Sequence, residues 1–157
     1  MRRPYSETLL RKIDELASRY PKKEAALIPV LRLVQEEAGC LSPDEEEFVA
    51  QTLGLKRMRV REVITFYTML TRRPLGKYHI QVCANLSCSL LGSATLLEYL
   101  QKKLGIGVGE TSADRKFTLT PVECLGACDQ APCMMVNTEY HGNLDPEEID
   151  RILAGLD

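Results

Sequence analysis

Apolar residues recur at helical spacing through the first half of the chain. Leu9, Ile13 and Leu16 are three or four residues apart, and Ser6 before them is a candidate N-cap. Pro21 is predicted to end this helix. Three more helices are predicted from the segments 27–38, with Pro29 at a kink or a late start, 42–53, which opens on the capping sequence Ser-Pro-Asp-Glu, and 60–67.

After residue 76 the spacing changes. Tyr78, Ile80 and Val82 alternate with polar residues, which predicts a strand that ends at Cys83. A helix is then expected over 90–104, strands over 117–122, over 133–136 and near Tyr140, and a last helix over 145–156. The order β-α-β-β-β-α, with two helices backing the sheet, is close to a thioredoxin-like layout.

The expected fold class is therefore α/β in two domains. Residues 1–74 are expected to form an N-terminal helical bundle, which we interpret as a docking domain. Residues 75–157 are expected to form a thioredoxin-like α/β domain with a mixed four-stranded sheet. The boundary is placed at the Pro74 segment, where the periodicity changes.

Composition narrows the function classes. The net charge is −2, which gives no general affinity for nucleic acid. No run of apolar residues is long enough to span a membrane, and the basic start lacks the apolar core of a signal peptide. We therefore expect a cytoplasmic protein, associated with a membrane only through a larger complex. Six cysteines in a reducing compartment favour metal ligation or redox chemistry over structural disulfides.

Four of these cysteines form two close pairs. Cys83 and Cys88 are separated by four residues, and Cys124 and Cys128 by three, and each pair follows a predicted strand. Iron–sulfur centres take Cys₄ ligation, so one pair could serve each iron of a [2Fe–2S] cluster. Gly126 between the second pair is expected to leave room for backbone N–H groups to approach the sulfurs.

The spacing leaves other sites open. A structural zinc site also uses paired cysteines two to four residues apart, so a zinc-stabilised interaction module remains an alternative. The tight cysteine run of a [4Fe–4S] ferredoxin and the C-x-x-C of a thioredoxin-type redox pair are both absent. A thiol–disulfide oxidoreductase is a remoter alternative.

The cysteine motifs resemble those of a known family. The segments VCANLSC, residues 82–88, and CLGACDQAP, residues 124–132, are similar to the thioredoxin-like [2Fe–2S] subunit of respiratory complex I, the 24-kDa or E subunit. The likeness extends through VITFY at residues 63–67 and across the helical half. The same subunit type is shared by NAD-linked hydrogenases, some of them electron-bifurcating, and by NAD-dependent formate dehydrogenases.

The resemblance implies an electron-transfer subunit. Cys83, Cys88, Cys124 and Cys128 would ligate one [2Fe–2S] cluster, both as its cofactor-binding residues and as its metal ligands. FMN and NAD(H) are expected on a partner, the flavin-binding iron–sulfur subunit of the 51-kDa type, with further iron–sulfur subunits in the same complex. Complex I, hydrogenase and formate dehydrogenase assemblies are not separated by the sequence.

Two cysteines lie outside this set. Cys133 stands where the resemblance leads us to expect an aliphatic residue, and we interpret it as a small hydrophobe at the start of a buried strand. Cys40 is interpreted as an ordinary thiol in the helical domain. The glycines at 105, 107 and 109 follow a helix, whereas a dinucleotide fingerprint follows a strand, so we expect a loop and no flavin or NAD site on this chain.

The helical half carries no predicted chemistry. Its basic residues at 56, 57, 59 and 61 are interpreted as a solvated helix face. Phe66, Tyr67, Met69 and Leu70 are expected in the core or in domain packing, or in a subunit contact if they are exposed. His79, on the strand that ends at Cys83, is expected to be a strand-surface residue.

Overall fold

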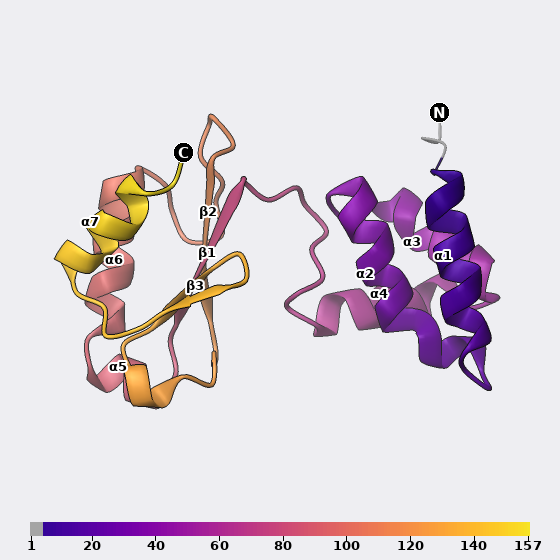
Figure 1. Cartoon of the computed structure of the whole chain (residues 1–157), viewed down its shortest axis with the longest axis horizontal. Coiled ribbons are helices and arrows are strands. Elements are labelled where there is room, and N and C mark those ends of the chain that lie inside the picture. Colours follow the sequence, from indigo (N-terminus) through magenta and orange to yellow (C-terminus); the bar gives the residue numbers. More distant parts are fainter. Residues whose placement is uncertain (1–4) are drawn as a thin grey trace. The chain divides into compact units, whose positions relative to one another are not determined.

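The computed structural model describes residues 5–157 as two compact units (Figure 1). One extends to Pro74 and is helical. The other runs from Leu75 to Asp157 and combines a sheet with helices. Each unit is built around its own apolar core, and each is described by itself below.

The described part of the helical unit contains four α-helices, and a 3₁₀ turn directly precedes the second of them. The elements are α1 (Glu7–Ser18), η1 (Lys23–Ala26), α2 (Leu27–Ala38), α3 (Pro43–Leu53) and α4 (Arg57–Phe66). These confirm the four predicted helices. Pro29 lies in the first turn of α2, where its missing N–H costs no helical hydrogen bond. Of the two predicted alternatives, a kink or a late helix start, the structure therefore shows the late start.

Local sequence signals set the helix ends. Ser6 accepts a hydrogen bond from the Leu9 N–H at the start of α1, and Ser42 forms a capping box with Glu45 at the start of α3. Gly54 ends α3 in the left-handed conformation, with a φ of 68°. These caps supply partners for backbone groups that have none within the helix.

The apolar faces of the four helices meet in one core. Its fully buried members include Val30, Leu31, Val34 and Val49. Burial of each aliphatic side chain of this size contributes about 1.5–3 kcal/mol. Leu70 also belongs to this core, as expected, whereas Phe66 is 78% exposed and Met69 is 55% exposed.

One carboxylate is buried beside this core. Glu46 on α3 has no exposed surface, and its two oxygens contact the guanidinium groups of Arg57, Arg61 and Arg72. The shortest contact, from Arg61 Nη2, is 2.8 Å. Burial alone would raise the pKa of Glu46, but the hydrogen bonds and charges of the arginines, Arg61 first, hold this pKa below its usual value.

The arginine cluster corrects two expectations. The basic segment at 56–61 is not simply a solvated face, because Arg57 and Arg61 are partners of a buried acid. The helical half, for which no chemistry was predicted, also contains a cluster of four charged groups around Glu46. Since Arg72 follows α4, the carboxylate joins α3, α4 and the segment beyond them.

The second unit is built on a mixed four-stranded sheet. Its strands are β1 (Tyr78–Cys83), β2 (Phe117–Val122), β3 (Met134–Val136) and β4 (Glu139–His141), in the order β2-β1-β3-β4. Strand β1 is parallel to β2 and antiparallel to β3, and β3 is antiparallel to β4. This is the thioredoxin-like α/β architecture that the sequence predicts.

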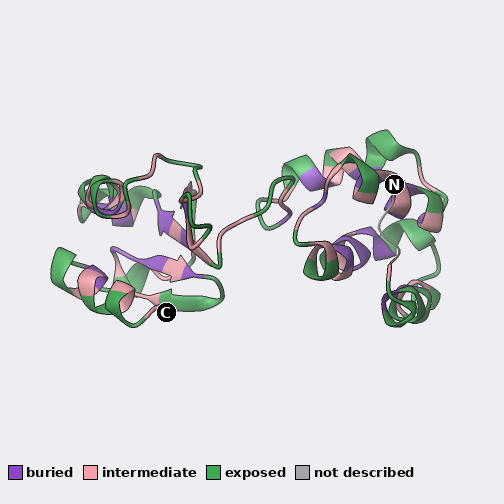
Figure 2. Cartoon of the chain, turned by 90° about the horizontal axis from the view of Figure 1, so that it is seen from above, coloured by how far each residue is buried: buried purple, intermediate pink, exposed green. Residues whose placement is uncertain are grey.

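Helices cover one face of the sheet. Helices α6 (Ser93–Leu104) and α7 (Pro146–Ala154) lie together on that side in Figure 1. The core between them and the strands is fully buried at Ile80, Leu100 and Ile149, and Figure 2 shows buried residues along the strands. Asp145 caps α7 by accepting the N–H of Glu148, as its sequence predicts.

The helix expected over 90–104 differs in one respect. The chain first forms a short helix, α5 (Leu86–Leu90), and α6 begins only after Gly92. Gly92 has a φ of 92°, which breaks the helical path and is readily adopted by glycine. Cys88 therefore lies within a helix of its own.

The segment between the units is anchored at both ends. The N–H of Thr71 donates to Gln35 Oε1 at 2.7 Å on the helical side. The N–H of Gly76 donates to Thr118 Oγ1 at 2.7 Å on the sheet side. A Cβ at Gly76 would lie 2.8 Å from the Phe117 backbone, so this approach requires glycine.

No helix within residues 5–157 has the length and apolar character needed to cross a membrane.

Glu46→Gln should destabilise the helical unit. Removal of one partner of a buried ion pair costs about 3–5 kcal/mol, and we expect a loss of about 3 kcal/mol because the three arginines are partly exposed. Urea unfolding followed by circular dichroism measures this loss in the free energy of unfolding. The matched control is Glu62→Gln, which removes an exposed pair with Arg59 and should change the free energy of unfolding by less than about 1 kcal/mol. Equal midpoints for the two variants would contradict the role of Glu46.

Candidate metal centre

Three buried cysteines meet at one end of the sheet. Cys83 ends β1, Cys88 lies in α5, and Cys133 directly precedes β3. Their Sγ atoms all lie within 4.8 Å of one another, and those of Cys88 and Cys133 are 3.7 Å apart. The three residues are 3%, 1% and 1% exposed, so this group of sulfurs is shielded from water. We refer to these residues as the thiol trio.

Backbone hydrogen bonds hold the trio in place. The N–H of Cys83 donates to the carbonyl oxygen of Cys133 at 3.1 Å, which continues the pairing between β1 and β3. The N–H of Ala84 donates to the Val122 oxygen at 2.8 Å, on the other side of β1. Asn85 then opens α5 by accepting the Leu86 N–H through its side chain, and this helix carries Cys88 inward.

The loop after β2 packs against the trio. Leu125, Ala127 and Ala131 are partly buried against the three cysteines, while Cys124 and Cys128 on the same loop are exposed. The N–H of Gly126 lies 3.3 Å from the Cys124 sulfur. Gly126 has a φ of 75°, and a Cβ on it would meet nothing within 4 Å. The glycine is therefore required for its backbone conformation, and not for the space that the sequence analysis assigned to it.

The structure thus divides the four predicted ligands. It brings Cys83 and Cys88 together and places Cys124 and Cys128 on the adjoining loop, outside the group of close sulfurs. Cys133 takes the third place in the group. Its burial agrees with the expected role as a small hydrophobe, but its contact with two predicted ligands was not expected. The sequence places Cys133 immediately before a predicted strand, but the pairing of that strand with β1, which brings Cys133 to the other two cysteines, is seen only in the structure.

The three thiols differ in acidity. Burial by itself raises the pKa of Cys83, but backbone N–H groups of Asn85 and Leu125 and the neighbouring thiols leave this pKa below the usual value. Burial raises the pKa of Cys88. Burial, with the adjacent Cys88, raises the pKa of Cys133 to about 12. Cys83 is therefore the thiol that most readily supplies a thiolate.

The residues fit an iron–sulfur cluster in their chemistry. A [2Fe–2S] cluster needs four thiolates, and two separate segments, one that starts at the end of β1 and one after β2, supply two cysteines each at this end of the sheet. Backbone N–H groups of the second loop already point at sulfur, at Cys83 and at Cys124. Such hydrogen bonds are one of the means by which a protein tunes a cluster.

Three other features considered in the sequence lie elsewhere. His79 Nε2 is 3.0 Å from Thr120 Oγ1, and burial lowers the pKa of this histidine. Cys40 belongs to the helical unit and is partly buried, and burial raises its pKa. The glycines at 105–109 lie in the segment between α6 and β2, where a loop was expected.

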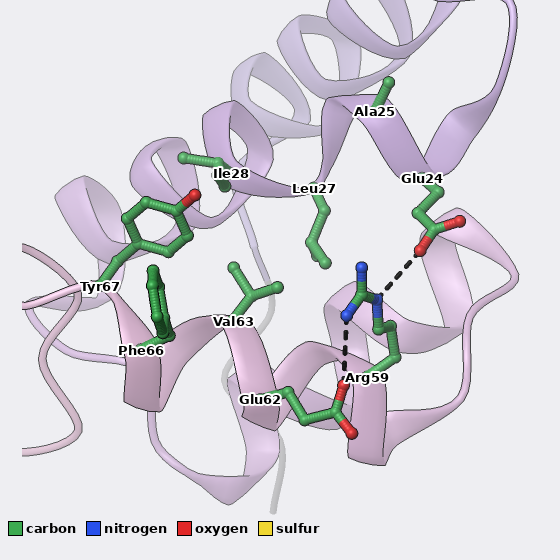
Figure 3. A pocket seen from close by; sticks show the side chains of 9 residues that line it. All are labelled: Glu24, Ala25, Leu27, Ile28, Arg59, Glu62, Val63, Phe66 and Tyr67. Carbon is green, nitrogen blue, oxygen red and sulfur yellow. Dashed lines mark hydrogen bonds and ion pairs between the residues drawn. The ribbon is translucent and has the colours of Figure 1, made fainter.

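A shallow groove marks the helical unit (Figure 3). It is lined by α4 and by the start of α2, and has a volume of about 430 Å³. Val63 and Phe66 form its apolar side, and Arg59 bridges Glu24 and Glu62 at its charged side. In the described part of this unit no group of three close histidine, cysteine or acidic side chains offers a metal site.

Comparisons with known proteins agree with this geometry. The family model for the thioredoxin-like [2Fe–2S] ferredoxin matches residues 13–157. The second E-type subunit of the NADH-quinone oxidoreductase of Rhizobium meliloti is 47% identical over 149 residues, which cover 95% of this chain and 89% of that protein. The E-type subunit of the NADH-quinone oxidoreductase of Rickettsia conorii is 40% identical over 146 residues, with 91% and 87% covered.

A solved structure shares the fold. The chain resembles part of an NAD⁺-reducing [NiFe]-hydrogenase with a TM-score of 0.69 and 21% identity. The likeness covers 80% of this chain and 22% of the hydrogenase chain. At this identity it bears on the fold alone.

Alkylation of the cluster-free chain should separate the cysteines into two classes. Cys124 and Cys128 are exposed, so iodoacetamide should label them at least about tenfold faster than the thiol trio, which reacts only through local opening. Peptide mass spectrometry over a time course measures the rates. Labelling in the presence of urea is the control, and it should remove most of the difference. Equal rates in buffer would contradict the burial of the trio.

Proposed function

The chain belongs to the thioredoxin-like [2Fe–2S] ferredoxin family, and we propose that it is the electron-transfer subunit of an NADH dehydrogenase assembly of the complex I type. One observation carries the proposal. A buried pair of cysteines, Cys83 and Cys88, lies under a second cysteine-bearing loop, in a chain that matches the E-type subunits of NADH-quinone oxidoreductases over nearly its whole length.

We propose Cys83, Cys88, Cys124 and Cys128 as the ligands of one [2Fe–2S] cluster. The first two already lie close together, and the other two lie on the loop that packs against them. When bound, the cluster accepts and releases one electron at a time. The chain contributes thiolates, a shielded site and backbone N–H groups aimed at the sulfurs.

Hydride chemistry is assigned to a partner. We propose that a flavin- and NAD-binding iron–sulfur subunit of the 51-kDa type holds FMN and binds NAD(H), with further iron–sulfur subunits beyond it. In support, the glycines at 105–109 follow a helix, which is not the context of a dinucleotide fingerprint. The relatives are named as subunits of an NADH-quinone oxidoreductase. The hydrogenase alternative is supported only by a likeness of fold.

The helical unit is proposed to dock on that same partner. Phe66, which lines the groove, exposes a large apolar side chain, and so does Met69 three residues on, which is unusual on a surface that contacts only water. The segment between the two units is short, because only residues 73–75 separate Arg72, bound to Glu46, from Gly76, bound to Thr118. A partner that exchanges electrons with the sheet unit is therefore within reach of the helical unit.

Serine variants test the ligand set. Cys83→Ser and Cys128→Ser should each lose most of the bound iron and sulfide, because each removes one of four thiolates from the cluster. Anaerobic purification, followed by iron, sulfide and zinc assays and by visible and electron paramagnetic resonance spectra, measures the loss. Cys40→Ser is the matched control and should keep the cluster, since Cys40 lies in the helical unit. Full iron content in Cys83→Ser or Cys128→Ser would refute the assignment.

Phe66→Ser should weaken assembly with the flavin-binding partner. Burial of a phenylalanine contributes about 1.5–3 kcal/mol, so we expect affinity to fall about 10- to 100-fold. Co-expression and quantitative co-purification measure the interaction, and cluster content should remain unchanged. Leu10→Ser, at another exposed apolar position of the helical unit, is the control and should assemble normally. Unchanged assembly of Phe66→Ser would exclude this face as the docking surface.

A further inference from the structure

The thiol trio shares only two of its three residues with the proposed cluster ligands. It contains Cys133, which the cluster does not need, in place of the two loop cysteines. We propose that in the cluster-free chain Cys83, Cys88 and Cys133 form a binding site for one Zn²⁺ ion. This site is distinct from the four-cysteine zinc site considered from spacing alone, because it uses Cys133 and neither Cys124 nor Cys128.

The sulfur positions match zinc in size. Zinc–thiolate bonds of about 2.3 Å in tetrahedral geometry place neighbouring sulfurs about 3.8 Å apart. The sulfurs of Cys88 and Cys133 are 3.7 Å apart, and all three lie within 4.8 Å of one another. Small side-chain rotations therefore bring the third sulfur to the same centre.

The scaffold holds these ligands before the metal arrives. Cys83 ends β1, Cys88 lies in helix α5, and Cys133 directly precedes β3. The hydrogen bond from the Cys83 N–H to the Cys133 oxygen joins the two strand positions directly. The pairing of β1 with β3 and the cap of α5 therefore set the three sulfur positions, whereas Cys124 and Cys128 lie on the exposed segment that follows β2.

The donor set selects the metal. Three thiolates without a carboxylate or imidazole favour zinc or another thiophilic ion over magnesium, calcium or manganese. Binding converts three thiols into thiolates and releases three protons to solvent. The positive ion compensates the thiolate charges that burial otherwise disfavours.

Zinc and the cluster exclude each other, a consequence that rests on the proposed ligand set. Cys83 and Cys88 belong to both sets, so a chain that holds zinc cannot present them to iron. Loss of Cys133 should leave the four cluster ligands intact and remove the competing ion. Cys133 would then determine which metal the newly folded chain accepts.

The test uses the full chain, freed of metal and fully reduced under anaerobic conditions. Zn²⁺ is titrated against a chromophoric chelator, and Co²⁺ replaces it as a spectroscopic probe of tetrahedral thiolate ligation. We expect one Zn²⁺ per chain. Cys133→Ala should weaken binding about 100-fold, because it removes one of three protein ligands. Cys133→Val is a second variant that refills the buried space, and circular dichroism checks the folding of both.

The double variant Cys124→Ser/Cys128→Ser is the matched control. It should bind Zn²⁺ within a few-fold of the wild-type affinity. If it loses zinc while Cys133→Ala retains it, the metal uses the loop cysteines and the inference is overturned. It is equally overturned if the wild type binds no zinc.

Cluster reconstitution separates this inference from the proposed function. Cys133→Ala should take up iron and sulfide as the wild type does, and zinc added beforehand should inhibit uptake in the wild type but much less in the variant. If wild-type chain without zinc takes up no iron and sulfide, the proposed function fails, whatever the zinc titration shows. If both take up the cluster and zinc inhibits them equally, only the role of Cys133 fails.

Discussion

The hydrogen-bond pairing of strand β1 with both neighbours is the constraint on which the site depends. Strand β1 is parallel to β2, so the segments that follow these two strands must emerge at the same end of the sheet. Strand β3 is antiparallel to β1, so the segment that precedes β3 reaches that end as well. Three cysteine-bearing segments that are distant in sequence are therefore brought to one edge by backbone geometry alone.

Burial then gives the two groups of cysteines different properties. The trio is dry, so its charged state requires a compensating cation or hydrogen bonds. Cys124 and Cys128 lie on an exposed loop whose path depends on the left-handed Gly126. Cys83 and Cys88 are buried and Cys124 and Cys128 are exposed, so the proposed cluster would lie at the boundary between the interior of this unit and solvent. The buried pair, together with Cys133, is the set proposed to bind a single ion.

The helical unit is stabilised by a different kind of interaction. Glu46 is a buried carboxylate that three arginines neutralise, and these arginines come from α4 and from the segment beyond it. Burial of these charged groups costs desolvation free energy, yet the network fixes the path by which the segment beyond α4 leaves the helical unit. The remaining surface of α4 carries the exposed Phe66 and the groove. One helix thus contributes its buried face to stability and its exposed face to the proposed contact with a partner.

Periodicity and capping residues by themselves determined the elements of this protein. The helix starts at Ser6, Ser42 and Asp145 and the strand that ends at Cys83 follow from short-range rules, because caps and alternation act within a few residues. The spacing of the cysteines and their neighbouring residues also indicated the family. The break at Gly92 was missed, since a lone glycine within a helical pattern is compatible with either outcome.

Only the tertiary structure decided which side chains meet. Strand order and register bring Cys133 to Cys83 and Cys88. Helix packing brings three arginines to Glu46, namely Arg57, Arg61 and Arg72. The same packing leaves Phe66 exposed although Ile64 and Leu70, close to it in the sequence, are buried. These contacts join residues far apart in the chain, and local patterns carry no information about the distance between such residues.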